Sequence, residues 1–355
     1  MSRIAPRADL QDLAGYHSPQ LDVSVRLNTN ESPYPPPPEF LDAWLRELRA
    51  ADLHRYPDRL AGALRQAIAE RFDRSADEVF AANGSNEVLQ TLLLTYGGPD
   101  RRALIFEPTY ALHAHISRLT GTRTITAHRG DDFLIDPRSA VSLIEREQPE
   151  IVFICSPNNP SGTIEPVDTI AAIADAAPGL VVVDEAYGEF ATTSALSLVS
   201  EERAVVVTRT YSKVWSLAAL RLGFLVGPTW LVAELDKVVL PYHLDVSTQT
   251  AGRVALNFVA DMESRVSRLV EERERLFRAL QDLSEITVFP SGANFLLFRC
   301  HGGGHAVWQA LVDDGVLVRD FSSWPGVEDC LRVTIGTPEE NDHFLAGLRA
   351  AVARK

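Results

Sequence analysis

Lysine is scarce in this 355-residue chain, and its scarcity draws attention to one position. Three lysines, Lys213, Lys237 and Lys355, stand against 31 arginines. A guanidinium group stays protonated and is a poor nucleophile, whereas an ammonium group can lose its proton and form an imine. Lys237 and Lys355 have ordinary explanations, as a helix-surface charge and as the last residue. Lys213 follows an apolar run, so it is the candidate for chemistry that arginine cannot perform.

Cysteines and long apolar runs are also few. Cys155, Cys300 and Cys330 are odd in number and lack paired spacing, which indicates neither a disulfide framework nor a zinc site. No stretch of 18 apolar residues occurs, and the first residues contain no apolar segment typical of a signal peptide. The sequence therefore predicts a cytoplasmic protein without a metal centre or a membrane segment.

The charge balance narrows the choice of partners. The formal net charge is −14 at pH 7, which argues against nucleic acid or an anionic membrane as the main partner. If the substrate is an anion, a local group of arginines has to overcome the repulsion of the whole chain.

Short apolar runs alternate with helical patterns through the first two thirds of the chain. The runs are continuous and rich in β-branched residues, which predicts a mostly parallel, buried sheet with helices on both faces. The expected fold class is α/β: a three-layer α/β/α large domain with a seven-stranded sheet, joined to a smaller α+β domain. The expected strands of the large sheet are 78–82, 103–106, 122–127, 151–155, 180–184, 204–208 and 222–226.

The pattern changes after about residue 240. One long helical stretch runs from Thr250 towards Leu283, and short strands are expected at 294–298, 316–319 and 331–335. Thr337 and Glu340 have the spacing of a capping box for a last helix. Four prolines at 35–38 predict a stiff connector. The expected division is an N-terminal arm (1–33), a large domain (34–245) and a small domain (246–355).

Polar residues follow four of the predicted strands, where parallel sheets place their sites. Ser85 and Asn86 open a helix whose free N–H groups suit a phosphate. Asp184 ends a buried strand, which is costly unless a cation compensates it or it caps a helix. The remaining members of the set are Asn159, Thr210, Ser212, Lys213 and Arg221.

An imine-forming lysine, a carboxylate for a ring nitrogen and an anion cradle are the requirements of pyridoxal 5'-phosphate. A dinucleotide or a P-loop site is the competing interpretation, but neither G-x-G-x-x-G nor G-K-[ST] occurs. His113 and His115 lack ligand partners at metal-binding spacing, so a helix surface is expected for them.

The chain resembles the histidinol-phosphate aminotransferases, class II aminotransferases of fold type I, over nearly its full length. The segments that carry the resemblance are Arg26–Glu31, His54–Asp58, Ala82–Glu87, Ser156–Gly162, Asp184–Tyr187, Thr210–Lys213, Arg221–Gly223, Pro241–Leu244 and Leu331–Thr334.

The resemblance implies a role for each matching residue. Lys213 would hold the cofactor covalently and move a proton between substrate and cofactor. Asp184 would pair with the ring nitrogen, Tyr187 and Asn159 would contact the ring hydroxyl, and Tyr110 would stack on the ring. The cofactor phosphate would be bound by Ser85, Asn86, Thr210, Ser212 and Arg221, and by Tyr56 from the other subunit of a homodimer.

It also implies transamination of L-histidinol phosphate with 2-oxoglutarate, giving imidazole acetol phosphate and L-glutamate in histidine biosynthesis. Arg332 would receive the glutamate carboxylate. The substrate phosphate would be met by Tyr16, Arg319 and Arg332, with Asn86 and Tyr242 as further contacts.

One segment departs from the family pattern, and three alternatives stay open. Val214–Leu220 replaces a stretch of small residues, and its bulky Trp215 and Leu220 bear on the shape of the pocket. An aromatic-amino-acid aminotransferase or a threonine-phosphate decarboxylase would use the same cofactor residues. The third alternative is a regulator built on an inactive aminotransferase, but no spare segment is suited to nucleic acid.

Overall fold

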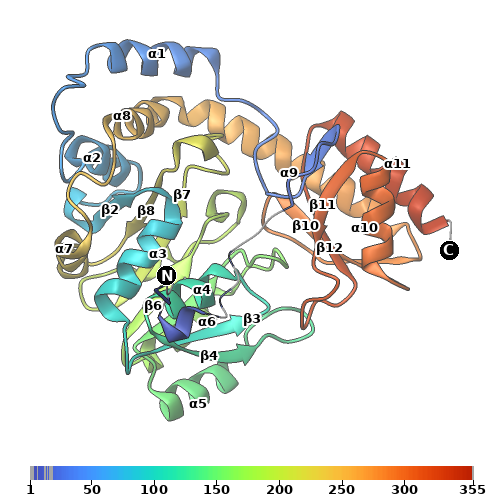
Figure 1. Ribbon diagram of the computed structural model, residues 1–355, viewed down its shortest axis with the longest axis horizontal. Coiled ribbons are helices and arrows are strands. Elements are labelled where there is room, and N and C mark those ends of the chain that lie inside the picture. Colours follow the sequence, from blue (N-terminus) through green and yellow to red (C-terminus); the bar gives the residue numbers. More distant parts are fainter. Residues whose placement is uncertain (1–3, 6, 12, 14, 16–18, 354–355) are drawn as a thin grey trace.

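The computed structural model describes residues 4–5, 7–11, 13, 15 and 19–353 and contains two β-sheets (Figure 1). The large sheet has the strand order β2-β8-β7-β6-β5-β3-β4. Only β8 runs antiparallel to its neighbours, so the predicted mostly parallel seven-stranded sheet is confirmed. Its strands are β2 (Val79–Ala82), β3 (Arg102–Glu107), β4 (Arg123–His128), β5 (Ile151–Cys155), β6 (Leu180–Asp184), β7 (Val205–Thr210) and β8 (Gly223–Val226).

Helices cover both faces of this sheet because its central strands are apolar on both sides. Successive side chains of a strand point to opposite faces. In β5, Ile151 and Phe153 pack with α3, α4 and α7, while Val152 and Ile154 pack on the face that α2, α5 and α6 cover. These helices are α2 (Gly62–Arg71), α3 (Gly84–Tyr96), α4 (Leu112–Leu119), α5 (Pro137–Glu147), α6 (Val167–Ala176) and α7 (Thr229–Val238).

The small sheet has the order β1-β11-β12-β10-β9, and β1 from the N-terminal arm forms its edge, parallel to β11. The sequence did not predict β1 or β9. Its strands are β1 (Val25–Leu27), β9 (Ile286–Val288), β10 (Phe295–Cys300), β11 (Val316–Asp320) and β12 (Cys330–Thr334). The accompanying helices are α10 (Gly304–Asp313) and α11 (Pro338–Ala353). Thr337 and Glu340 form the predicted capping box at the start of α11.

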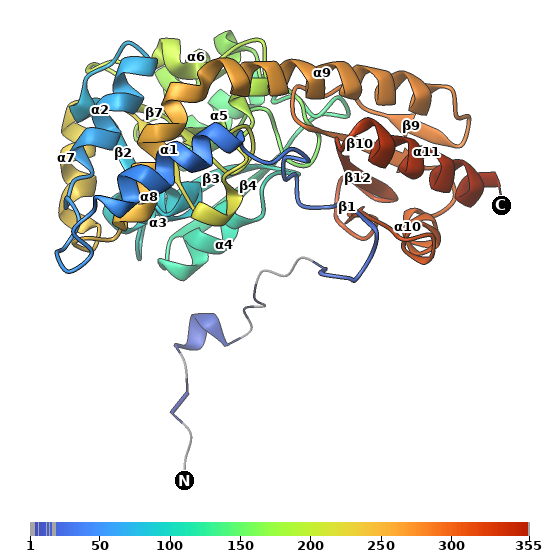
Figure 2. The ribbon, with the colours of Figure 1, turned by 90° about the horizontal axis from the view of Figure 1, so that it is seen from above.

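The predicted long helical stretch after residue 250 is present, but a 3-10 turn that the sequence did not predict divides it. The chain forms α8 (Val246–Ala255), a 3-10 turn (Leu256–Phe258) and then α9 (Val259–Gln281). The turn directs Phe258 edge-on against Phe40 of α1 (Pro38–Arg49), with ring centroids 6.0 Å apart. α9 then extends from the large sheet to the small one (Figure 2).

The predicted domain limits stay a prediction, although α8 packs against α1 and α2 of the large body. Within the described residues, no helix has the length and apolar character needed to cross a membrane.

A buried ion pair between Arg129 and Glu165 ties the carboxyl ends of β3 and β5 together, directly below the edge where the polar residues gather. The Arg129 guanidinium also donates to the carbonyl oxygens of Phe106 (3.1 Å) and Cys155 (3.3 Å). Phe106 is the last residue but one of β3, and Cys155 is the last residue of β5. Neither side chain is exposed to solvent. Such a pair positions the strand ends, and losing one partner leaves an uncompensated buried charge.

We therefore expect Glu165→Ala to lower the free energy of unfolding by about 3–5 kcal/mol, because Arg129 loses its only carboxylate partner in the described structure. Urea denaturation followed by fluorescence measures this change. Glu234→Ala is the matched control: its pair with Lys237 is exposed, so its effect should stay within about 0.5 kcal/mol. Equal effects of the two substitutions would contradict the assignment.

Candidate active site

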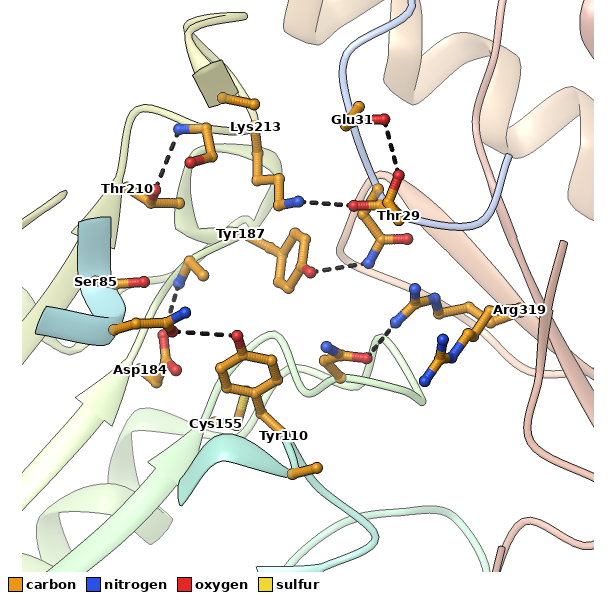
Figure 3. Close-up of a pocket in the computed structure, with 18 of the residues that line it drawn as sticks. Thr29, Glu31, Ser85, Tyr110, Cys155, Asp184, Tyr187, Thr210, Lys213 and Arg319 are labelled. Carbon is orange, nitrogen blue, oxygen red and sulfur yellow. Dashed lines mark hydrogen bonds between the residues drawn. The ribbon is translucent and has the colours of Figure 1, made fainter. Parts of the chain in front are cut away.

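A pocket of about 410 Å³ lies where the carboxyl ends of β5, β6 and β7 face the small sheet (Figure 3). The large body contributes one wall, the residues 28–31 after β1 contribute a second, and β11, β12 and the loop between them contribute a third. Of the residues that the sequence singled out, the pocket is lined by Ser85, Asn86, Tyr110, Asn159, Asp184, Tyr187, Thr210, Ser212, Lys213, Arg221, Arg319 and Arg332.

Lys213 points into this pocket from the loop after β7. Its Nζ donates to the carbonyl oxygen of Thr29 at 2.8 Å (Figure 3). Burial, followed by the charges of Arg332 and Arg221, lowers the pKa of Lys213 to about 8, against the opposing effect of the Glu31 carboxylate. A large fraction of this amine is therefore unprotonated, and nucleophilic, at mildly alkaline pH.

Asp184 ends β6 and is 2% exposed. Its Oδ2 lies 3.0 Å from Nε2 of His113, and its Oδ1 accepts from the N–H of Ala186 at 3.1 Å and from the Thr208 hydroxyl at 3.3 Å. The carboxylate therefore caps the turn after β6 rather than a helix, since the residue before the next 3-10 helix is Tyr187. Its hydrogen bonds keep it in place at the pocket wall.

The prediction of a surface position for His113 was wrong. The side chain is 1% exposed, stacks on Phe153 with ring centroids 4.8 Å apart, and contacts the Asp184 carboxylate. His113 lies three residues before Ile116 on the buried face of α4, and this helical spacing was a signal that the sequence contained. His115, on the other hand, is half-buried.

Ser85 and Asn86 in the first turn of α3 line the pocket, and the first backbone N–H groups of a helix have no partner within the helix, which suits an anion. Gly223 lets β8 approach this helix end closely, because a Cβ there would lie 2.2 Å from the backbone nitrogen of Ser85. Arg221 adopts φ 53°, and its guanidinium donates to the Ser212 hydroxyl (3.3 Å) and to the carbonyl of Ala218 (2.9 Å). Hydroxyl, amide and guanidinium donors thus converge on one corner.

Two tyrosines line the remaining wall of the large body. The Tyr110 hydroxyl donates to Oδ1 of Asn86 at 3.1 Å, and the Tyr187 hydroxyl accepts from Nδ2 of Asn30 at 2.8 Å. Burial raises the pKa of Tyr187 to about 12, so this phenol keeps its proton at neutral pH.

Arg319 and Arg332 are neighbours on β11 and β12 and close the pocket from the small sheet. The Arg332 guanidinium donates to Oδ1 of Asn159 and to the carbonyl oxygen of Asn28, so it bridges the two bodies. The Cζ atom of Arg332 lies 5.4 Å from the centroid of the Phe321 ring, and the Cζ atom of Arg319 lies 5.8 Å from the same centroid. Two cations therefore flank one aromatic ring at the mouth of the pocket.

Two predicted residues of the described part of the chain are not part of this lining. Tyr56 and Tyr242 stack on each other at the surface, with ring centroids 4.4 Å apart and exposed fractions of 80% and 42%. Tyr16 lies outside the described residues, so its predicted contact with the substrate stays a prediction. The bulky segment after Lys213 does not narrow the pocket: Trp215 packs in the core against Tyr211, and the small Ala218 and Ala219 form the lining.

Several lining residues received no role from the sequence. They come from the segment after β1 and from the loop between β11 and β12: Asn28, Thr29, Asn30, Glu31, Phe321 and Trp324. Cys155 also lines the pocket, and burial raises the pKa of its thiol. Among the described residues, no group of three or more histidine, cysteine, aspartate or glutamate side chains could hold a metal ion.

Comparisons with known proteins agree on one family. Residues 23–348 match the model of the family "aminotransferase class I and II". The chain is 46% identical to the histidinol-phosphate aminotransferase of Thermobifida fusca (98% of this chain, 95% of the relative) and 43% identical to that of Corynebacterium efficiens (98% and 94%).

Solved structures share the fold. The crystal structure of the histidinol-phosphate aminotransferase from Sinorhizobium meliloti in complex with pyridoxal-5'-phosphate is similar with a TM-score of 0.89, at 24% identity and over 98% of this chain and 97% of that one. The L-threonine-O-3-phosphate decarboxylase from Porphyromonas gingivalis is similar with a TM-score of 0.80, at 20% identity and over 93% and 99%.

The lowered pKa of Lys213 can be tested on the protein without cofactor. Because only the neutral amine reacts, the rate at which an acylating reagent modifies Lys213 should rise with pH through a midpoint near 8. Glu31→Gln should lower this midpoint, since it removes a negative charge that favours the ammonium form. Mass spectrometry of the modified peptide measures the rate. Glu234→Gln, remote from the pocket, is the control, and a wild-type midpoint near 10.5 would contradict the prediction.

Proposed function

We propose that this chain, which belongs to the class I and II aminotransferase family, uses pyridoxal 5'-phosphate to transfer the amino group of L-histidinol phosphate to 2-oxoglutarate. The products are imidazole acetol phosphate and L-glutamate, a transamination of histidine biosynthesis. The observation that carries this function is one pocket that contains an amine with a lowered pKa, a buried carboxylate, a set of donors suited to an anion, and two arginines. The 43–46% identity to histidinol-phosphate aminotransferases over nearly the full chain supports the choice of substrate.

The pocket fits the cofactor on its own geometry. The donors at the start of α3, with Thr210, Ser212 and Arg221, suit a phosphate, and the Asp184 carboxylate suits a protonated ring nitrogen. Tyr187 and Asn159 would bind the ring hydroxyl, and Tyr110 would stack on the ring. Lys213 would hold the cofactor covalently. When bound, pyridoxal phosphate supplies an electron sink for the charge that develops at the substrate Cα.

The protein's own groups perform the proton transfers and the orientation. The Lys213 amine, neutral at mildly alkaline pH, can take the proton from the substrate Cα and return it. His113 and the Ala186 N–H fix the Asp184 carboxylate, which would keep the ring nitrogen of the cofactor charged. Arg332 would bind the glutamate carboxylate in one half of the reaction, while Arg319 and Arg332 would bind the substrate phosphate in the other, with Asn86, Tyr242 and Tyr16 as further contacts.

We also propose a homodimer with shared sites. Tyr56 and Tyr242 stay outside the pocket of their own chain, and both lie among exposed apolar side chains that include Leu53 and Leu240, 74% and 76% exposed. An exposed apolar patch of this kind is typical of an interface. The pair would thus complete the pocket of a partner subunit, with Tyr56 reaching the cofactor phosphate. A cytoplasmic location belongs to the same proposal.

The choice of substrate is tested by comparing amino donors. Purified, reconstituted protein should use histidinol phosphate with a higher kcat/KM than phenylalanine, and it should release no carbon dioxide from threonine phosphate. A preference for phenylalanine would identify an aromatic-amino-acid aminotransferase, and carbon dioxide release would identify a decarboxylase.

Arg319→Ala tests whether the substrate phosphate and the glutamate carboxylate are bound by different arginines. A desolvated guanidinium–phosphate pair contributes about 1.5–3 kcal/mol, so kcat/KM for histidinol phosphate should fall roughly 10- to 100-fold. The half-reaction with glutamate should fall much less, because Arg332 binds that carboxylate. Arg299→Ala is the control: it removes an arginine of the same sheet that is not part of the pocket lining. Unchanged turnover of histidinol phosphate in Arg319→Ala would refute its role.

Mixed dimers test the shared site. A Lys213→Ala chain mixed with a Tyr56→Phe chain should regain activity, since one of the two sites in each hybrid is intact. Random assortment makes about a quarter of all sites intact. Lys213→Ala mixed with Asp184→Ala is the control and should regain nothing, because both residues belong to one pocket. Failure of the first mixture, with subunit exchange demonstrated, would rule out the contribution of Tyr56.

A further inference from the structure

Asn30, in the segment after β1, forms hydrogen bonds through both its backbone and its side chain, and it has no role in the proposed mechanism. It is 1% exposed and has a φ of 54°, a left-handed conformation that asparagine tolerates better than most residues. Its backbone N–H donates to Oγ1 of Thr334 (2.9 Å), and its carbonyl accepts from Nδ2 of Asn294 (3.2 Å). Its side chain bridges Thr334 on β12 and Tyr187 in the large body.

The Thr334 hydroxyl determines which atom of the Asn30 side-chain amide faces Tyr187. The Thr334 hydroxyl accepts from the Asn30 backbone N–H and donates its own proton to Oδ1 of Asn30, at 3.0 Å. The amide nitrogen therefore faces Tyr187, and an amide NH2 group can only donate. With the amide turned over, the Thr334 proton would have no acceptor within the described part of the chain. The network thus holds Asn30 in one orientation.

The consequence falls on Tyr187. Its hydroxyl oxygen accepts from Asn30 at 2.8 Å, so its own proton has to point elsewhere. Within the described residues no acceptor lies within hydrogen-bond distance of that proton, and Tyr187 lines the pocket. Its ring is held edge-on against Phe295, with centroids 5.0 Å apart. Tyr187 is therefore a fixed donor towards whatever occupies the pocket.

The geometry points to Asn30 as a positioning residue that makes Tyr187 a hydrogen-bond donor to the ring oxygen of the cofactor and couples this donor to the small sheet. This inference rests on the cofactor of the proposed function. The coupling follows from β12, where Thr334 lies two residues after Arg332 on the same face of the strand. A movement of the arginine that binds the substrate is thereby transmitted to Tyr187. The neighbouring residue, Thr29, accepts the hydrogen bond of Lys213.

The test uses the pH titration of the visible absorbance of reconstituted protein, which reports the proton shared by the bound cofactor and Lys213. A donor on the ring oxygen withdraws electron density, so the donor lowers this midpoint. Asn30→Asp introduces a group that only accepts, and Tyr187 must then donate to residue 30 instead of the cofactor. The midpoint should rise by about one pH unit or more. Asn30→Gly, which tolerates the positive φ and takes no proton from Tyr187, should raise it less.

Two further sets of variants separate this role from the added charge and from misfolding. Thr334→Val, which removes the hydroxyl that orients the amide, should raise the midpoint. Thr334→Ser, which keeps a hydroxyl at this position, should have the wild-type midpoint. In a Tyr187→Phe background, Asn30→Asp should have no additional effect.

Three results would overturn the inference. A wild-type midpoint in Asn30→Asp, or a shift that persists undiminished in Tyr187→Phe, would refute it while leaving the proposed function intact. Wild-type protein that takes up no pyridoxal phosphate would refute the inference and the proposed cofactor together.

Discussion

The site depends on keeping the Lys213 amine out of water without pairing it with a carboxylate. A carboxylate in contact would stabilise the ammonium form and abolish the nucleophile. Among the described residues none lies within ion-pair distance, and the amine donates instead to the neutral carbonyl of Thr29. Burial and the nearby Arg332 and Arg221 lower its pKa to about 8, so cations that suit an anionic substrate or a cofactor phosphate also favour the neutral amine.

The fold meets this constraint by assembling the pocket from three parts of the chain. The parallel sheet places Cys155, Asp184 and Thr208 side by side at its carboxyl edge, and Thr210 follows at the end of β7. β12 brings Arg332 across from the small sheet, and the segment after β1 lies between the two. Because Asn30 and Arg332 both bridge these parts, opening the two bodies would expose Lys213 to water and raise its pKa.

The sequence predicted most of the large sheet, because its strands are continuous apolar runs. It predicted eight residues of the pocket because they follow strand ends, and four more, Tyr110, Tyr187, Arg319 and Arg332, only through the family resemblance. It did not assign roles to Thr29 and Asn30, since their contacts depend on how the arm packs against β11 and β12. His113 was misplaced because a histidine on an apolar helical face was taken as a surface residue. At the turn between α8 and α9, Phe258 contacts Phe40, which is more than 200 residues earlier in the chain, and local periodicity carries no information about such a contact.

The proposed function requires that Lys213 holds the cofactor. Borohydride reduction of the reconstituted protein, which makes the bond permanent, followed by digestion and mass spectrometry, tests this directly. We expect the mass of the reduced cofactor on the peptide that contains Lys213, and none on Lys213→Ala protein. Cofactor on the peptide of the exposed Lys237, or on no peptide at all, would contradict it.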